Sequence, residues 1–178
     1  MLASCPTLRI DEVSSPCYLG GIGTRGRKRQ MARNRKAPAR VQVAVRVPEG
    51  RHAASVLRAA ARGWVREELS IALVSDREMR ALNRRWRGKD RPTDVLSFPL
   101  LEPDSLGDVV ISIDTARRQA REGGWPLATE LRRLLAHGIL HCRGYDHEQR
   151  AGALRMAAAE RRLLGSEGMV GASLTDRD

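Results

Sequence analysis

The chain has 178 residues, of which 42% are hydrophobic, and it carries a formal net charge of +11 with a pI near 11.0. This length suffices for one well-buried domain, and no apolar run approaches the roughly 18 residues that a membrane-spanning helix needs, so we expect a soluble protein. The excess of basic over acidic residues favours a polyanionic partner, and both nucleic acid and an anionic membrane surface fit that description.

Most of the positive charge lies in residues 1–40. This segment has nine basic and two acidic residues, a net of +7, and mixes Pro, Gly, Ser and Arg without a sustained apolar period. We therefore predict a disordered basic extension over 1–40, with non-specific, salt-sensitive binding of RNA as its functional alternative. Because Met31 lies just upstream of the patterned sequence, one hypothesis is that translation begins there.

Regular patterning starts at Val41. Valines alternate with other residues over 41–47, which predicts a strand with one buried face. Apolar residues at helical spacing predict a helix over 53–65, and the short apolar run 69–74 predicts a second strand.

The next helix is predicted from its start signal. Ser75 and Glu78 form a capping box, so a helix should begin at about Asp76. Its inner face should carry Met79, Leu82 and Trp86. The polar, turn-forming segment 87–93 should follow it.

Two further strands and three further helices are predicted beyond that turn. The strands are 94–98 and 107–113, and the helices start at Asp114, which should act as N-cap, at about Leu127 and at about Glu148. Hairpin-like and crossover connections are mixed. The pattern indicates a single α+β domain over 41–165, with about five helices packed on a mixed four-stranded sheet, followed by a loose tail over 166–178.

The cysteines indicate a reducing compartment. Cys5, Cys17 and Cys142 make an odd count without a Cys-x-x-Cys pair, so we predict free thiols in a cytoplasmic protein. No secretory signal is predicted, because the N-terminus lacks a basic region followed by an apolar core and a small-residue cleavage site.

Three of the four histidines fall within one short segment, as His137-x-x-x-His141-x-x-x-x-x-His147. Histidines four apart lie on one face of a helix, and Gly144 allows the backbone to turn and bring the third imidazole back. Three neutral nitrogens around zinc leave the fourth tetrahedral position for water, as in catalytic sites. We predict one Zn²⁺ per chain on the central helix and the turn after it. His52 has no partner at ligand spacing and is predicted to be an ordinary surface residue.

The segment lacks the general base of zinc peptidases. Their His-Glu-x-x-His motif places a glutamate after the first histidine, where this chain has Gly138. Peptide hydrolysis would need another base, and the nearest carboxylates in sequence are Glu130, Asp146 and Glu148. For Asp146 we favour a supporting role, in which it orients a histidine through the second ring nitrogen or caps the turn.

Three blocks of the sequence form a recognisable set. The first is His137-Gly138-Ile139-Leu140-His141 with Gly144-Tyr145-Asp146-His147. The second is the segment Asn83 to Pro99, with Arg87-Gly88-Lys89-Asp90 and Thr93-Asp94-Val95-Leu96-Ser97-Phe98-Pro99, and the third is Leu106-Gly107-Asp108-Val109-Val110-Ile111. Together they resemble the YbeY-type endoribonucleases, the rRNA maturation factors of bacteria. The blocks occur in the family's order at compatible spacing. The resemblance covers about residues 41–165.

The resemblance implies a metal-dependent endoribonuclease for single-stranded RNA, which acts in 3′-end maturation of 16S rRNA and in ribosome quality control. It implies pre-16S rRNA and the ribosome or ribosomal proteins as partners. In this sequence His137, His141 and His147 match the family's zinc ligands, and Arg87 matches its functional arginine. A guanidinium suits that role because it stays charged and donates two parallel hydrogen bonds to a phosphate.

The sequence departs from the family at Cys142, where the pattern usually has an apolar residue, commonly leucine. A cysteine can pack as a small hydrophobe, and we expect it to face away from the histidines. The basic N-terminal extension lies outside the resemblance.

The favoured hypothesis is therefore a zinc-dependent endoribonuclease in which Arg87 stabilises the scissile phosphate. Zinc can lower the pKa of bound water to about 7, so an adjacent carboxylate is dispensable. The sequence leaves open whether water or the RNA's own 2′-hydroxyl attacks. A second hypothesis is a ribosome-assembly factor with a chiefly structural metal site, and a third, disfavoured by Gly138, is a metallopeptidase-like hydrolase.

Overall fold

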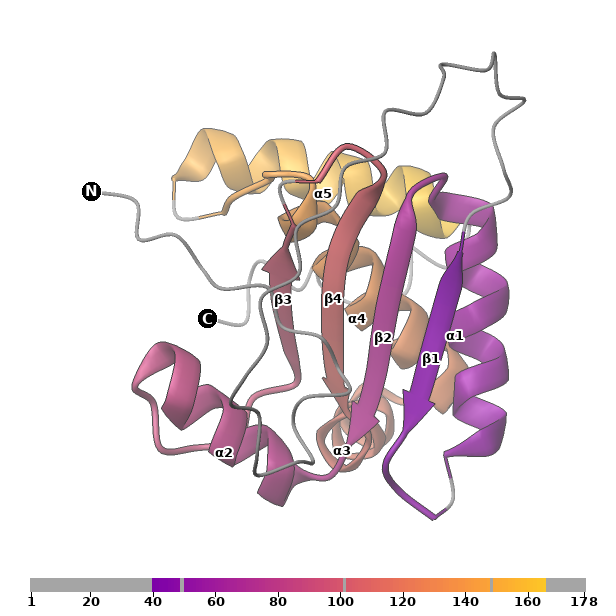
Figure 1. The fold of residues 1–178 in the computed structure, drawn as a ribbon, viewed down its shortest axis with the longest axis vertical. Helices are drawn as coiled ribbons and strands as arrows, with labels where there is room; N and C mark the ends of the chain where they lie inside the picture. Colours follow the sequence, from indigo (N-terminus) through magenta and orange to yellow (C-terminus); the bar gives the residue numbers. More distant parts are fainter. Residues whose placement is uncertain (1–39, 49, 101, 148, 166–178) are drawn as a thin grey trace, which may run out of the picture.

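The computed structural model describes residues 40–48, 50–100, 102–147 and 149–165 (Figure 1). Its elements are β1 (Val41–Val45), α1 (Arg51–Trp64), β2 (Glu68–Val74), α2 (Asp76–Arg87), β3 (Val95–Pro99), β4 (Ser105–Ser112), α3 (Ile113–Gly123), α4 (Leu127–Cys142) and α5 (Arg150–Leu164). The predicted α+β domain, with a four-stranded mixed sheet and five helices in the described ranges, is confirmed.

Parts of the sequence-based predictions concern other residues. The basic extension up to residue 39, with Met31, Cys5 and Cys17, and the tail 166–178 lie outside the described residues. Within the described part of the chain, no helix is both long enough and apolar enough to cross a membrane.

The sheet has the strand order β1-β2-β4-β3, in which β1, β2 and β4 run parallel and β3 runs antiparallel to β4. The central strands β2 and β4 are buried on both faces and accordingly read as nearly continuous apolar runs. The edge strand β1 ends at Val45, two residues before the predicted end. Arg46 still donates its N–H to Leu73 at 2.9 Å, but the chain then turns, with Gly50 donating to Val47.

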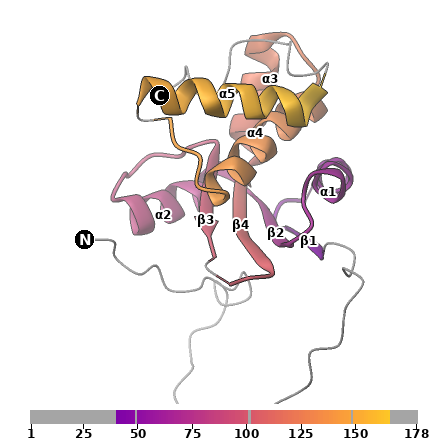
Figure 2. The ribbon, with the colours of Figure 1, turned by 90° about the horizontal axis from the view of Figure 1, so that it is seen from above.

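Helices α1, α3, α4 and α5 lie on one side of the sheet, and α4 lies between the sheet and α5 (Figure 2). The main apolar core fills the space between the strands and α1, α3 and α4, and it contains the fully buried side chains of Leu57, Ile71, Leu131, Leu134 and Ile139. Burial of each such side chain contributes about 1.5–3 kcal/mol. Because α4 carries two of the predicted ligands, this core fixes the position of the metal helix.

Helix α2 packs on the opposite face of the sheet. Its predicted inner residues Met79, Leu82 and Trp86 contact apolar residues of β2, β3 and β4. The predicted N-cap is confirmed at its start, where the Ser75 hydroxyl accepts the N–H of Glu78 at 3.3 Å. The other half of the predicted capping box differs, because the Glu78 carboxylate accepts a hydrogen bond from the Arg46 guanidinium at 2.8 Å.

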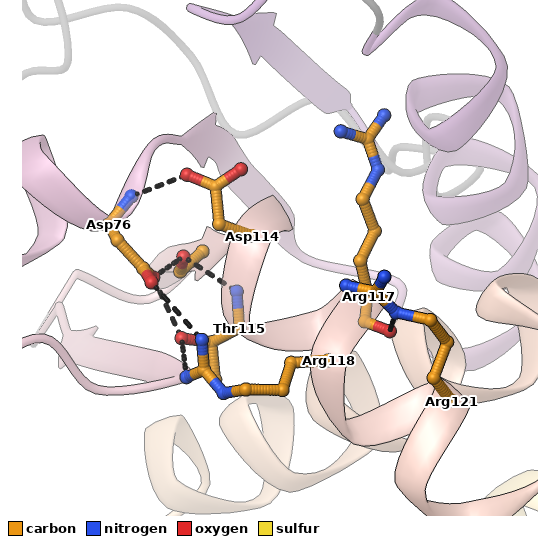
Figure 3. Close-up of polar contacts among 7 residues, drawn as sticks. Asp76, Asp114, Thr115, Arg117, Arg118 and Arg121 are labelled. Atoms are coloured by element: carbon orange, nitrogen blue, oxygen red, sulfur yellow. Dashed lines mark hydrogen bonds and ion pairs between the residues drawn. The ribbon is translucent and has the colours of Figure 1, made fainter.

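The start of α2 is tied to the start of α3 (Figure 3). The Asp76 carboxylate accepts hydrogen bonds from the hydroxyls of Ser112 and Thr115, the latter at 2.7 Å. The prediction of Asp114 as N-cap of α3 is wrong: β4 ends sooner than expected, so Ser112 is the cap and accepts the N–H of Thr115. Asp114 lies in the first helical turn and accepts the backbone N–H of Asp76 at 2.9 Å instead. This network anchors α2, whose far end carries Arg87.

Candidate metal centre

The three predicted ligands lie together at the end of α4. His137 and His141 are one helical turn apart, and the chain leaves the helix through Gly144, which has φ +80°. The Gly144 N–H donates to the His141 carbonyl at 2.9 Å, closing the last turn. A left-handed residue at this point returns the chain over the helix end, so the predicted role of Gly144 is confirmed and His147 reaches the other two rings.

The imidazoles converge on one point. One ring nitrogen from each of His137, His141 and His147 lies within 4.8 Å of the other two, and the Nε2 atoms of His137 and His141 are 3.0 Å apart. Two nitrogens bound to one tetrahedral zinc at about 2.0–2.1 Å would stand about 3.3 Å apart. The spacing of the His137 and His141 nitrogens is close to this value, and three convergent imidazole nitrogens are a donor set that suits a metal ion. His137 is buried and the other two are half-buried, so the centre faces solvent on one side.

The second ring nitrogen of His137 is held by a residue that the sequence analysis missed. Its Nδ1 lies 2.8 Å from Oε1 of Glu160, on α5. Sequence reasoning favoured Asp146 for orienting a histidine, and for His137 this contact comes from Glu160. The sequence offered only the four-residue spacing that places Glu160 on the same face of the predicted helix as Met156, and it did not indicate the partner; the structure buries both residues.

The environment keeps His141 neutral. Burial is the main cause that lowers its pKa to about 4, and the neighbouring rings of His137 and His147 lower it further. A hydrogen bond to the backbone of Tyr145 acts in the opposite direction. A neutral imidazole has the free lone pair that a metal ligand requires.

Arg87 lies within electrostatic reach of the histidines. It is exposed on the last turn of α2, and its charge also lowers the pKa of His141. The helix ends directly after it at Gly88, which adopts φ 70° and donates its N–H to the Arg84 carbonyl at 3.1 Å. The fold therefore brings a guanidinium from a separate sequence block towards the centre.

Gly138, at the motif position where a zinc peptidase has its glutamate, packs against the sheet. A Cβ atom at this position would lie 2.7 Å from the Val109 side chain and 3.1 Å from the Ser97 hydroxyl, so α4 rests closely on β3 and β4. This position faces the sheet and has no room for a carboxylate. Glu130 is fully buried and accepts the indole N–H of Trp125 at 2.6 Å. Glu148 lies outside the described residues.

Cys142 stands apart from the metal-ligand group, as predicted. Its sulfur lies 4.0 Å from the Asp108 carbonyl, and its side chain packs against the main core. Burial, with the nearby negative charge of Asp108, raises its pKa to about 12. The thiol is therefore protonated at neutral pH and packs as a small hydrophobe.

Three convergent imidazoles that are open to solvent on one side, with an arginine in electrostatic reach, fit the open metal centre of a hydrolase better than a closed structural site. The family model of Endoribonuclease YbeY matches residues 43–168. Endoribonuclease YbeY of Anaeromyxobacter sp. (strain Fw109-5) is 55% identical over 139 residues, 72% of this chain and 72% of that protein. Endoribonuclease YbeY of Myxococcus xanthus (strain DK1622) is 50% identical over 147 residues, 75% of this chain and 50% of that protein.

A solved structure agrees with these similarities. The solution structure of a Thermotoga maritima protein superimposes with a TM-score of 0.55 at 30% identity, covering 72% of this chain and 88% of that one. The chain belongs to the endoribonuclease YbeY family. The predicted activity is thereby confirmed: this is a metal-dependent endoribonuclease of the family known for 3′-end maturation of 16S rRNA. The histidine cluster fits the metal site typical of that family.

Proposed function

We propose that this chain is a zinc-dependent endoribonuclease that cuts single-stranded pre-16S rRNA in the bacterial cytoplasm, in contact with the ribosome or its proteins, and also serves ribosome quality control. His137, His141 and His147 bind the metal, and Arg87 holds the scissile phosphate. The observation that carries the proposal is the convergence of three imidazole nitrogens within 4.8 Å in a chain of this family.

The donor set favours zinc. Imidazole nitrogens suit zinc, whereas magnesium and calcium prefer carboxylate, carbonyl and water oxygens. When bound, zinc supplies a Lewis acid that polarises a phosphoryl oxygen and acidifies water near neutral pH. The protein's own contribution is to keep His141 neutral and to hold His137 by a hydrogen bond to Glu160 at 2.8 Å.

The end of α2 offers a surface for the RNA backbone. Exposed cations of the last turn and of the loop after it gather there, namely Arg84, Arg85, Arg87, Lys89 and Arg91. Cations at this end are also stabilised by the helix dipole, and they would neutralise phosphates in a salt-dependent manner. A single strand can bend to place one phosphate between these cations and the histidines, whereas an A-form duplex is much less adaptable.

The first experiment combines metal analysis with cleavage. The purified chain is expected to hold about one zinc per molecule and to cut a single-stranded RNA but not the same sequence in a duplex. Chelation should abolish cleavage, and added zinc should restore it. RNA cleavage that survives complete chelation would contradict the proposal, and so would equal cleavage of the two substrates.

The second experiment tests Arg87. Arg87→Ala should reduce cleavage about 10²–10³-fold with unchanged zinc content, because a donor to the developing phosphate charge is lost. Arg87→Lys should recover only part, since an ammonium group cannot donate the same paired hydrogen bonds. Arg62→Ala, an exposed arginine on α1, is the matched control. Unchanged cleavage by Arg87→Ala would remove this residue from the mechanism.

Two further measurements separate the alternatives. Zinc-loaded wild-type protein that binds pre-rRNA particles but never cuts RNA would favour the assembly-factor hypothesis. The ends of the products report the attacking group: a 2′,3′-cyclic phosphate indicates the RNA's own 2′-hydroxyl, and a 5′-phosphate with a 3′-hydroxyl indicates water.

A further inference from the structure

We infer that Glu160 is a positioning residue of the metal centre, which acts from α5 by fixing the ring orientation and the tautomer of His137. The inference rests on the proposed function, because it takes the three histidines as metal ligands. It concerns a residue that lies 23 positions from the histidine it contacts and outside the histidine segment.

The contact determines which nitrogen of His137 carries the proton. Oε1 of Glu160 lies 2.8 Å from Nδ1, and both side chains are less than a tenth exposed. A carboxylate can only accept hydrogen bonds, so Nδ1 must donate and Nε2 keeps its lone pair. That Nε2 is the atom 3.0 Å from Nε2 of His141. The hydrogen bond therefore points the lone pair at the centre.

Without this contact the ring has an alternative orientation. The torsion that rotates an imidazole about its bond to Cβ is broad and roughly two-fold, so packing alone selects the ring face poorly. The carboxylate distinguishes the two nitrogens, because only a protonated nitrogen can lie against it. Hydrogen bonds of this kind make a metal-binding imidazole more basic and hold it in place.

Glu160 and His147 are placed by the same packed unit. On α5, Met156 and Ala159 pack against Leu140 of α4. At the start of α5, a Cβ atom on Gly152 would lie 2.3 Å from the Asp146 carbonyl, so the helix rests against the loop that carries His147. Docking of α5 on α4 therefore brings in the carboxylate and the third ligand together.

Packing alone does not account for an acid at this position. A buried carboxylate is costly unless it is hydrogen-bonded, and its neighbours on the inner face of α5, Met156 and Ala159, are apolar. An apolar residue would fill the same space without that cost. The hydrogen bond that Glu160 accepts from His137 is a contact that an apolar residue could not make.

The test measures metal binding by the full chain, without RNA. Zinc affinity is measured by competition with a chromophoric chelator, and the ligand field is followed by the absorption spectrum of the Co²⁺-substituted protein. Glu160→Ala should weaken zinc binding by about 100-fold and alter the cobalt spectrum. Glu160→Gln keeps an accepting oxygen but loses the charge, so it should weaken zinc binding by about 10-fold.

Glu130→Gln is the matched control. Glu130 is also a fully buried glutamate, it lies on the metal helix itself, and it is bonded to Trp125 rather than to a histidine. This variant should lower the melting temperature but leave the zinc affinity and the cobalt spectrum as in the wild type. A general loss of stability is thereby separated from a specific effect on the metal centre.

Wild-type affinity and spectrum in both Glu160 variants would overturn the inference. If Glu160→Ala does not fold, Glu160→Gln decides, because it has the same shape, and an unchanged affinity and spectrum in that variant would be sufficient to reject the role. A wild-type chain that binds zinc in a Glu160-dependent manner but cuts no RNA would overturn the proposed function alone. A wild-type chain that takes up no metal would overturn both.

Discussion

The two ends of α4 both bury polar side chains, but they satisfy them in different ways. Near the start of the helix, Glu130 accepts the indole N–H of Trp125 at 2.6 Å, and the guanidinium of Arg133 lies 3.7 Å from the same carboxylate and 4.9 Å above the indole ring. At the other end, three imidazoles direct nitrogens at one another. In the first set a buried carboxylate has its hydrogen-bond donor and its counter-charge inside the protein, whereas the second set presents a shared point for an ion. The same helix thus carries a structural network and a functional one.

The two ends of α4 contribute to stability in different ways. Loss of one member of a buried ion pair lowers the free energy of unfolding strongly, because the other charge is left buried without its partner. The histidine lone pairs stabilise the fold only when an ion is bound, since a ligand that binds the folded state alone raises the free energy of unfolding. Substitutions at the two ends of α4 should therefore affect different measurements.

The largest expected effect is on the metal end. His141→Ala should abolish stoichiometric zinc binding and reduce RNA cleavage by more than the roughly 100-fold that loss of a supporting residue costs. The metal-free chain should unfold much as the wild type does, because His141 is only half-buried. Zinc analysis, a cleavage assay and urea unfolding with and without zinc check these outcomes. His52→Ala, an exposed histidine on α1, should behave as wild type, and one bound zinc in His141→Ala would refute the ligand assignment.

The structural end should show the opposite behaviour. Glu130→Ala should lower the free energy of unfolding by about 3–5 kcal/mol, because Arg133 is left buried without its carboxylate. Urea denaturation of the metal-free chain measures this loss. Replacement of both partners, Glu130→Leu with Arg133→Met, should recover most of it, since apolar side chains can replace a buried ion pair at little cost. A loss below 1 kcal/mol for the single variant would show that the network does not hold this end of α4.

The difference between the two ends also explains what the sequence could reveal. Local signals predicted the start of α2 at Ser75 and the buried strand β2, because a cap and an apolar run depend on neighbouring residues. The histidine cluster was visible because its spacing is local to one helix and one turn. The error at Asp114 came from a boundary: β4 ended sooner than its apolar run indicated, and Ser112 took the cap.

Local sequence patterns could not predict contacts between residues that are far apart in the chain. Glu160 meets His137 over 23 residues, and only the docking of α5 on α4 brings them together. Arg87 had the sequence of a solvated turn residue, and its role was implied by the family resemblance alone. The fold supplies the physical reason for considering it, because its charge acts on His141. Which of several exposed cations faces a site depends on the packing of α2, which no local pattern encodes.

Between the two ends of α4, Gly138 allows the helix to pack closely on the sheet. Gly138→Ala should destabilise the chain by about 1–2 kcal/mol, because the new Cβ would lie 2.7 Å from Val109 and a better helix propensity offsets only part of that strain. Gly63→Ala on α1 is the control, since nothing lies within 4 Å of the new methyl group and a gain of about 0.5–1 kcal/mol is expected. Urea denaturation compares them, and an equal gain in both variants would show that α4 is not tightly packed at Gly138.

A smaller, pH-dependent effect is expected at Asp108, the buried acid of β4. Unlike Glu130, it has one oxygen, Oδ2, without a hydrogen-bond partner among the described residues. Burial raises its pKa from 3.8 to about 6, and a hydrogen bond from Ser70 acts in the opposite direction. The folded state therefore holds this proton more tightly than the unfolded state, so the contribution of Asp108 to stability falls as pH rises from about 4 to 6 and stays low above that.

Asp108→Asn removes this titration and keeps the shape of the side chain. Relative to the wild type, the variant should gain stability as the pH rises through that window, by about 1 kcal/mol at pH 7.5, where the full shift sets an upper bound of about 3 kcal/mol. Urea unfolding at several pH values measures the difference. Asp90→Asn is the control of opposite sign, because the Arg80 guanidinium holds the pKa of Asp90 below its usual value of 3.8, so the stability from that pair is lost only as pH falls below that value. If the free energies of unfolding of Asp108→Asn and the wild type differ by the same amount at every pH in the window, the Asp108 carboxyl is paired as fully as that of Glu130. The contrast between the two buried acids would then disappear.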